Sequence, residues 1–160
     1  MNLRTKIKRV RDVELPKYAK PGDSGFDLVA AEDTVIYPGK TTVIPTGLAF
    51  EIPPGYELQV RPRSGISRKT FLRVVLGTVD SGFRGEVGVI VSNTSYIGNH
   101  ITLGINDDSG IYANVKYEIK KGDRIAQGVI APVETANFVE VDELSDSQRG
   151  KNGFGSTGVK

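Results

Sequence analysis

The chain has 160 residues, which is enough for one domain with a substantial core. Its net charge of +2 does not indicate a nucleic acid or a membrane surface as partner. It contains no cysteine and one histidine, His100, which excludes thiol nucleophiles, disulfides, zinc–thiolate sites and multi-histidine metal sites. Catalysis must therefore depend mainly on carboxylates, arginines, hydroxyls, backbone amides or a hard metal ion.

The basic segment at residues 4–11, RTKIKRVR, is interpreted as the solvated face of a terminal strand, because Ile7 and Val10 interrupt its charges. No apolar signal-peptide region follows it, and no run approaches the ~20 apolar residues of a membrane span. We therefore expect a cytoplasmic protein.

Residues 24–30, SGFDLVA, place Asp27 among apolar, strand-like neighbours. A carboxylate buried there is costly unless it is paired or bound to a cation. The stretch alone leaves a structural turn and a functional carboxylate both open.

The middle of the chain shows regularly spaced turns and short strands. YPGK (37–40) and PPGY (53–56) have the Pro-Gly order of type II turns, and YELQVRP alternates apolar and polar residues. EVGVIVSN (86–93) is a continuous apolar run that predicts a strand buried on both faces, and NFVEVDEL (137–144) alternates again. The pattern predicts a single all-β barrel or sandwich.

A helix of 12 or more residues is not expected anywhere. The segment SRKTFLRVVL (67–76) comes nearest, but its β-branched residues weaken the helical interpretation. The last residues, RGKNGFGSTGVK (149–160), have the composition of a flexible terminus. Their arginine, single phenylalanine and Gly-Ser-Thr-Gly run would also suit a lid that closes over a phosphate.

Three other stretches combine charge, hydroxyls and tight turns: PRSG (62–65), LGTVDSGFRGE (76–86) and KKGDRIAQ (120–127). None contains a Walker lysine loop or a dinucleotide glycine fingerprint. Each is weak evidence by itself, and their joint presence carries the argument.

Taken together, SGFDLVA, PRSGIS, GTVDSGFRGE, GDRIAQ and RGKNGFGSTG resemble, in order, the five motifs of the trimeric dUTPases. The resemblance runs from about residue 15 to the C-terminus. It implies a jelly-roll-like β-barrel subunit at 1–147, a flexible C-terminal lid arm at 148–160, and a homotrimer whose sites each use three chains.

The resemblance also implies an activity, the Mg²⁺-dependent hydrolysis of dUTP to dUMP and pyrophosphate. This reaction keeps uracil out of DNA and supplies dUMP for thymidylate synthesis. Asp80 would be the general base for water attack on the α-phosphorus. Asp27 would hold a water of the Mg²⁺ ion, which is carried mainly by the triphosphate.

The remaining site residues follow from the same resemblance. The uracil would be recognised by the backbone around Leu76, Gly77 and Gly88, while Phe83 would pack on the deoxyribose. The other substrate-binding residues implied are Arg63, Ser64, Gly65, Gln127, Arg149, Phe154, Gly155, Ser156 and Thr157, with Phe154 stacked over uracil.

The sequence departs from the family pattern in three places. Phe83 stands where tyrosine is usual, and Gly82 replaces a common acidic residue. The segment 92–123 is longer than the usual link and forms an insert of unknown role. Within it Tyr96 and Tyr112 are open to a lid role, although surface packing is the expected reading.

Two alternatives remain beside the dUTPase interpretation. A dCTP deaminase or bifunctional relative would lack the arginine-glycine-phenylalanine tail and the pairing of Asp80 with Phe83. A nucleotide-sensing binding protein, with the 92–123 insert as its partner surface, is the second alternative, as an added role.

Overall fold

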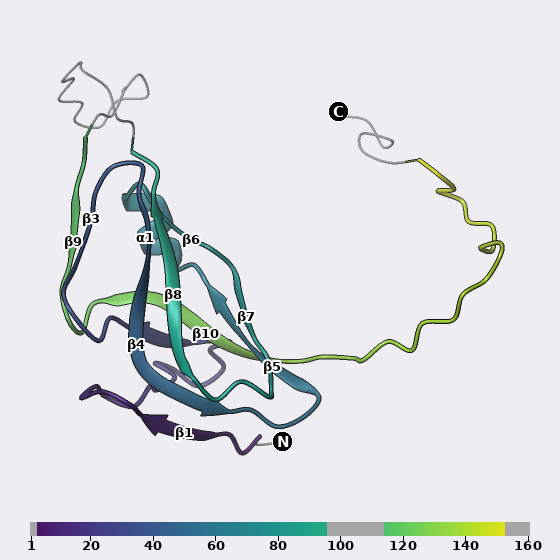
Figure 1. The fold of residues 1–160 in the computed structure, drawn as a ribbon, viewed down its shortest axis with the longest axis horizontal. Helices are drawn as coiled ribbons and strands as arrows, with labels where there is room; N and C mark the ends of the chain where they lie inside the picture. The colour runs from purple at the N-terminus through teal and green to yellow at the C-terminus, as the bar shows by residue number, and fades with distance from the viewer. Residues whose placement is uncertain (1–2, 96–113, 153–160) are drawn as a thin grey trace.

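The computed structural model describes residues 3–95 and 114–152, and within these ranges nearly all regular structure is β-strand (Figure 1). The elements are β1 (Lys6–Arg9), β2 (Phe26–Val29), β3 (Thr34–Ile36), β4 (Thr41–Glu51), β5 (Tyr56–Arg61), α1 (Ser64–Lys69), β6 (Leu72–Val74), β7 (Gly77–Val79), β8 (Glu86–Asn93), β9 (Tyr117–Ile119) and β10 (Arg124–Pro132). The expected all-β class is confirmed. No helix in the described residues is long and apolar enough to cross a bilayer.

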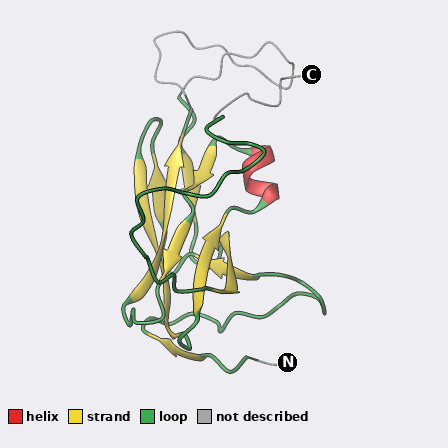
Figure 2. Cartoon of the chain, turned by 90° about the vertical axis from the view of Figure 1, so that its right-hand side faces the viewer, coloured by secondary structure: helices red, strands yellow, loops and turns green. Residues whose placement is uncertain are grey.

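Two four-stranded sheets form the body. Sheet A has the order β1-β4-β8-β6, sheet B has the order β2-β10-β5-β7, and β3 and β9 form a separate pair. All these pairings are antiparallel and join strands that are mostly distant in sequence. Figure 2 shows the strands side by side with the short helix at the flank. The inner side chains of both sheets make one apolar core, which includes Leu28, Ile44, Leu58 and Val89.

The turns follow from the Pro-Gly pairs. Gly39 and Gly55 have φ values of 68° and 81°, the left-handed region in which glycine is favoured. Tyr56 N–H donates to the Pro53 carbonyl at 3.2 Å, which closes the second turn. These turns start β4 and β5 at the expected places.

The prediction that residues 86–93 are buried on both faces is wrong for the chain by itself. Burial along β8 alternates, and Ile90 is 40% exposed while Val89 and Val91 are buried. Ile90 pairs with Val43, and its carbonyl accepts from the N–H of Val75 at 2.9 Å. The outer face of sheet A thus carries an apolar row of Val43, Ile90 and Val75, which we call the sheet A row.

The segment 67–76 is neither one helix nor one strand. α1 begins at Ser64 and ends at Lys69, and β6 starts three residues later. The hydroxyl of Thr70 donates to the Ile66 carbonyl at 2.7 Å and accepts from the N–H of Leu72 at 3.1 Å. Thr70 therefore bridges the helix end to the strand, which the sequence pattern did not indicate.

The expected strand at 137–144 does not form in this chain. After β10 the described residues 133–152 contain no helix or strand and lead away from the body (Figure 1). Phe138 is 92% exposed and Leu144 is 88% exposed. A strand needs a neighbouring strand to satisfy its backbone, and the described strands do not pair with this segment.

Candidate active site

The predicted phosphate-side and metal-side residues meet at one end of sheet B. Asp27 on β2 lies opposite Gln127 on β10, and Gln127 lies opposite Arg61 at the end of β5. This register brings PRSG, which follows β5, beside Asp27. The result is a polar hollow of about 320 Å³, the Asp27 pocket, lined by Lys17, Ala19, Asp23, Ser24, Gly25, Asp27, Arg63, Ser64, Arg124 and Gln127.

Ion pairs tie two arginines to one carboxylate in this pocket. Arg63 Nε lies 2.9 Å from Asp27 Oδ1, and Arg124 Nη1 lies 3.5 Å from Asp27 Oδ2. Arg63 Nη1 also donates to the Arg124 carbonyl at 3.1 Å. Asp27 and Arg63 are each about 30% exposed, at 30% and 28%, so the pair is partly shielded from water. The half-buried carboxylate therefore has the cationic partners that its position requires.

A β-bulge directs Arg124 into the pocket. The register between β10 and β2 shifts between Arg124 and Ala126, so that Arg124 pairs with Val29 and Ala126 pairs with Leu28. Ile125 and Ala126 are consecutively buried as a result. Side chains in a regular strand alternate between faces, and the extra residue of a bulge moves the side chains on one side of it to the opposite face. Arg124 consequently shares a face with Asp27.

The other pocket residues are positioned by backbone contacts. Gln127 Nε2 donates to the Pro62 carbonyl at 2.9 Å, and so joins β10 to the PRSG turn. Ser64 and Gly65 form the first turn of α1, whose amides have no acceptor within the helix. A Cβ on Gly25 would lie 3.0 Å from Gln127 Oε1, so this glycine lets the SGFDLVA segment pass close to β10.

Asp80 occupies a separate, tightly organised turn between β7 and β8. The Phe83 N–H donates to the Asp80 carbonyl at 3.0 Å. Arg84 Nη1 donates to the carbonyls of Ser81 at 2.6 Å and Phe83 at 2.9 Å. Both Asp80 and Phe83 are exposed. The turn therefore presents a carboxylate and an aromatic ring on a braced backbone.

Leu76, Gly77 and Gly88 lie where two strands diverge. The N–H of Val75 bonds to the Ile90 carbonyl, but Gly77 pairs with Val60 of β5 in the other sheet. Neighbouring residues in a strand direct their backbone groups to opposite sides, so Gly88 presents its N–H and C=O on the same side as Ile90. These backbone groups therefore point towards the gap that opens between β8 and the Leu76–Gly77 segment, where that segment turns away to join β5. The arrangement suits recognition of a planar, hydrogen-bonding ligand by backbone atoms.

The Asp80 turn and the Asp27 pocket do not meet within one chain. Val79 pairs with Leu58, which places Asp80 beside the start of β5, whereas Arg63 follows the end of β5. Six residues of extended strand span roughly 20 Å. β10 and β5 also separate the strands that precede or carry these two carboxylates. A reaction that needs both must draw them from different copies of the chain.

Several predicted residues lie elsewhere. Arg149 is exposed on the 133–152 segment, where its Nε donates to the Asn152 carbonyl at 3.1 Å. Outside the described residues lie Tyr96, His100, Tyr112, Phe154, Gly155, Ser156 and Thr157, and most of the insert.

The structure adds pocket residues that sequence reasoning missed. Arg124 was part of the GDRIAQ motif but had no assigned role, and its place depends on the bulge. Lys17 and Asp23 enter through the loop before β2, and no pattern in the sequence pointed to them.

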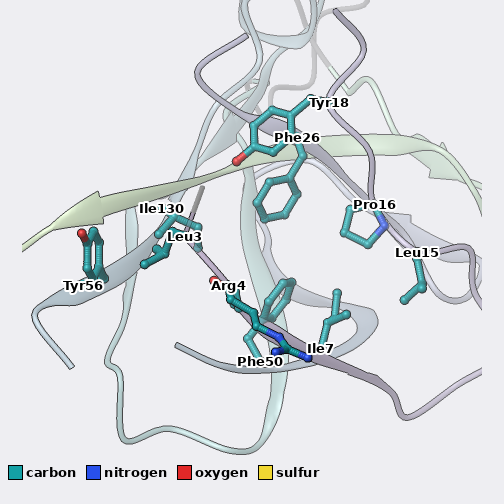
Figure 3. A pocket seen from close by; sticks show the side chains of 11 residues that line it. Leu3, Arg4, Ile7, Leu15, Pro16, Tyr18, Phe26, Phe50, Tyr56 and Ile130 are labelled. Carbon is teal, nitrogen blue, oxygen red and sulfur yellow. The ribbon is translucent and has the colours of Figure 1, made fainter. Parts of the chain in front are cut away.

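A larger hollow of about 740 Å³ lies beside β1 and has a different character (Figure 3). Phe26 and Phe50 stack with ring centroids 6.0 Å apart, and Tyr18 meets Phe26 edge-on at 5.7 Å. Arg4 is the one charged residue among the described residues of its lining. None of the predicted site residues within 3–95 and 114–152 lines it, and its apolar walls suit no triphosphate.

Comparisons with known proteins agree with this geometry. The dUTPase family model matches residues 11–104 and 111–158. The deoxyuridine 5'-triphosphate nucleotidohydrolase of Thermobifida fusca is 46% identical over 159 residues, covering 98% of this chain and 79% of that protein.

Solved structures extend the agreement to the fold. A variant of the Staphylococcus bacteriophage 80alpha dUTPase with dUpNHpp has a TM-score of 0.87 and 34% identity, covering 98% of this chain and 99% of that one. A variant of the phage phi11 dUTPase of S. aureus, described for its coordination of a structural Mg(II) ion, has a TM-score of 0.78 and 30% identity over 89% of this chain and 99% of that one. The expected jelly-roll-like fold is confirmed. The chain belongs to the dUTPase family and is a hydrolase that acts on dUTP.

Proposed function

We propose that this protein hydrolyses dUTP to dUMP and pyrophosphate with Mg²⁺, at sites shared between the chains of a homotrimer. The observation that carries the proposal is the gathering of Asp27, Arg63, Ser64 and Gln127 in one pocket, with Asp80 roughly 20 Å away along β5. One copy supplies the Asp27 pocket, a second supplies the Asp80 turn, and a third supplies its arm. The product dUMP then serves thymidylate synthesis, and the cytoplasm is the proposed location.

In the proposed reaction Asp80 accepts a proton from the water that attacks the α-phosphorus. The bond from that phosphorus to the bridging oxygen breaks, and pyrophosphate leaves. The braced turn around Asp80 keeps its carboxylate in place, because Phe83 and Arg84 bond to the turn's own carbonyls. Arg63 and the first-turn amides of α1 compensate the charge on the departing phosphates.

The residues present are compatible with a Mg²⁺ ion that is coordinated mainly by the triphosphate. The described residues contain no group of three or more His, Cys, Asp or Glu that could enclose a metal ion. Asp27 offers a hard carboxylate in the pocket, and Mg²⁺ prefers a few carboxylate contacts together with waters and phosphate oxygens. When bound, the ion would offset phosphate charge, with Asp27 as its protein contact through water.

Specificity for uracil and deoxyribose would come from the second copy. The backbone of Leu76, Gly77 and Gly88 can pair with the uracil edge, and cytosine would leave buried groups unpaired at roughly 1–3 kcal/mol each. The Phe83 ring gives an apolar wall against which a 2′-hydroxyl would clash. The tail residues Arg149, Gly155, Ser156 and Thr157 would close over the phosphates, and Phe154 would stack on uracil.

The surface of sheet A supports assembly with other copies. The sheet A row of Val43, Ile90 and Val75 is 60%, 40% and 45% exposed. A second cross-strand row on the same face consists of Thr41, Ser92 and Arg73, and the side chains of Thr41 and Ser92 bond to each other at 2.8 Å. Arg73 is the one charged residue in these two rows. An uncharged row of this kind, beside the proposed uracil-binding backbone, is the surface we assign to contact with a neighbouring chain.

The decisive test is pyrophosphate release with Mg²⁺ from dUTP, dTTP, dCTP and UTP, for the wild type and Asp80→Asn. We expect hydrolysis of dUTP alone. The variant should be slower by roughly a hundredfold to ten-thousandfold, the contribution of a general base, and should still bind dUpNHpp. Processing of dCTP with release of ammonia, or an active Asp80→Asn, would contradict the assignment.

A second candidate is an added, nucleotide-dependent binding role. The phage 80alpha dUTPase, which aligns with 98% of this chain, is described as controlling transfer of virulence genes by a G protein-like mechanism. A partner surface in this chain would lie on the 92–123 insert. Replacing residues 97–112 by a short glycine-serine turn should leave dUTP hydrolysis intact and remove partner binding. If the shortened protein keeps every interaction of the whole one, this role is dropped.

A further inference from the structure

The Asp27 pocket contains more positive charge than a single phosphate-binding arginine supplies. Lys17, Arg63 and Arg124 face two carboxylates, Asp23 and Asp27. The carboxylates differ in what they do: Asp23 accepts a hydrogen bond from the Lys20 N–H at 2.8 Å, whereas Asp27 contacts both arginines.

Asp27 uses the arginine donors that a phosphate needs. Its Oδ1 takes the Nε–H of Arg63 at 2.9 Å, and its Oδ2 faces Nη1 of Arg124. Guanidinium groups bind phosphate through these same N–H donors. A phosphate that enters the pocket must therefore share or displace the Asp27 carboxylate.

The local geometry holds this arrangement in place. The bulge at Ile125 brings Arg124 to the Asp27 face of β10, and the Arg124 carbonyl accepts from Nη1 of Arg63. The two arginines are thus linked to one another as well as to the carboxylate. A cation that draws Asp27 towards itself would release both guanidiniums at once.

We infer that Asp27 restrains Arg63 and Arg124 until a phosphate-bound cation engages it, and that Arg124 is a further phosphate-binding residue. The inference rests on the proposed function and deepens it, because it couples the cation to the exposure of the arginines. Asp27 is therefore a positioning residue. Its loss should strengthen phosphate binding when Mg²⁺ is absent and should remove the effect of Mg²⁺ on that binding.

The test measures binding of inorganic tripolyphosphate to the full-length protein by calorimetry, first with a chelator and then with Mg²⁺. With the chelator, Asp27→Asn should bind about tenfold more tightly than the wild type, because a competing, partly shielded carboxylate is removed. Mg²⁺ should strengthen binding by the wild type and have little effect on the variant. Arg124→Gln should weaken binding in both conditions.

Asp23→Asn is the matched control, since it makes the same charge change in the same pocket and keeps an oxygen for the Lys20 N–H. If Asp27→Asn binds no more tightly than Asp23→Asn in the chelator, the restraint is wrong and Asp27 only orients the arginines. Unchanged binding by Arg124→Gln would overturn that residue's role.

Wild-type hydrolysis of dUTP, measured in parallel, distinguishes a failure of this inference from a failure of the proposed function. Active wild type with an unaltered Asp27→Asn affinity contradicts only this inference. Wild type that neither binds tripolyphosphate nor cleaves dUTP contradicts the proposed function, and the inference with it.

Discussion

The ring of Phe83 lies directly over the backbone of Gly85. A Cβ built on Gly85 would come within 2.6 Å of Cζ and 3.0 Å of Cε2 of that ring, closer than real carbon contacts. Phe83 also donates its N–H to Asp80, so the ring position and the carboxylate position belong to one turn. Gly85 is therefore the residue that permits the Phe83 ring to lie where it does.

Gly85→Ala should displace the Phe83 ring and weaken discrimination against ribose. We expect the ratio of kcat/KM for dUTP over UTP to fall by about tenfold, the range of a single poorly fitted contact. Gly82→Ala is the control, because a Cβ there meets nothing within 4 Å in the same turn. Equal effects of the two alanines would show that the ring is not held by Gly85.

Charge in the sheet A row should prevent assembly. Val43→Glu or Ile90→Glu places a carboxylate on the surface assigned to a neighbouring chain, where burial of an unpaired charge is costly. Sedimentation should show monomers without dUTP hydrolysis. Val10→Glu, a comparable valine that is 43% exposed near β1, should remain trimeric and active. An active monomer would contradict the shared site.

Mixing two strongly impaired variants should restore activity if the site is shared. Arg63→Ala damages the Asp27 pocket and Asp80→Asn damages the distant turn, so a mixed trimer contains some sites with both parts intact. Co-refolded variants should hydrolyse dUTP well above the sum of the low rates of the two variants alone. Failure to recover any activity from verified mixed trimers would place both residues in a site within one chain.

The buried polar residues of the described chain are Thr46, Asn93 and Ser95. Of these, Asn93 should lower the free energy of unfolding most when it is replaced. Its Nδ2 donates to the carbonyls of Ile36 at 3.0 Å and Val115 at 2.7 Å. Its Oδ1 accepts from both the N–H and the hydroxyl of Ser95. It thus joins β3 and β8 to both flanks of the 96–113 segment.

Asn93→Ala leaves two carbonyls without this donor, so the free energy of unfolding should fall by about 3 kcal/mol. Urea unfolding at fixed protein concentration measures the change. Thr94→Ala, which loses one exposed bond to Phe71, should cost less than about 1 kcal/mol. Comparable costs would show that the buried position of Asn93 does not matter.

Asp33 should contribute an acid-dependent part of the stability. The backbone N–H of Lys121 and the ammonium of Lys120 lower the pKa of Asp33 below its usual 3.8. A carboxyl with a lowered folded-state pKa stabilises the fold above the unfolded value, and this stabilisation is lost as the pH falls below it. Asp33→Asn should lower the thermal midpoint at pH 7, and the difference from wild type should shrink below about pH 4.

Asp12→Asn is the comparison for this titration. Asp12 is fully exposed and lies 3.4 Å from Lys121 Nζ, so its removal should have little effect at either pH. A difference between wild type and Asp33→Asn that does not change with pH would mean that Asp33 acts through shape and not through charge.

Local sequence chemistry determined much of this protein. Pro-Gly pairs place the turns at Gly39 and Gly55, and alternation in 56–61 correctly predicts which side chains of β5 face the core. Motif order was enough to assign the family. These features depend on neighbouring residues, which act through turn geometry and the two-residue period of a strand.

The tertiary structure decided what depends on pairing between distant segments. The register of β10 with β2 and its bulge bring Arg124 to Asp27, and the sheet order keeps Asp80 away from both. The face of Ile90 stays open because no strand among the described residues covers it. Strand order, bulges and exposed faces depend on contacts between segments tens of residues apart, and a local pattern does not indicate which distant strands pair with each other.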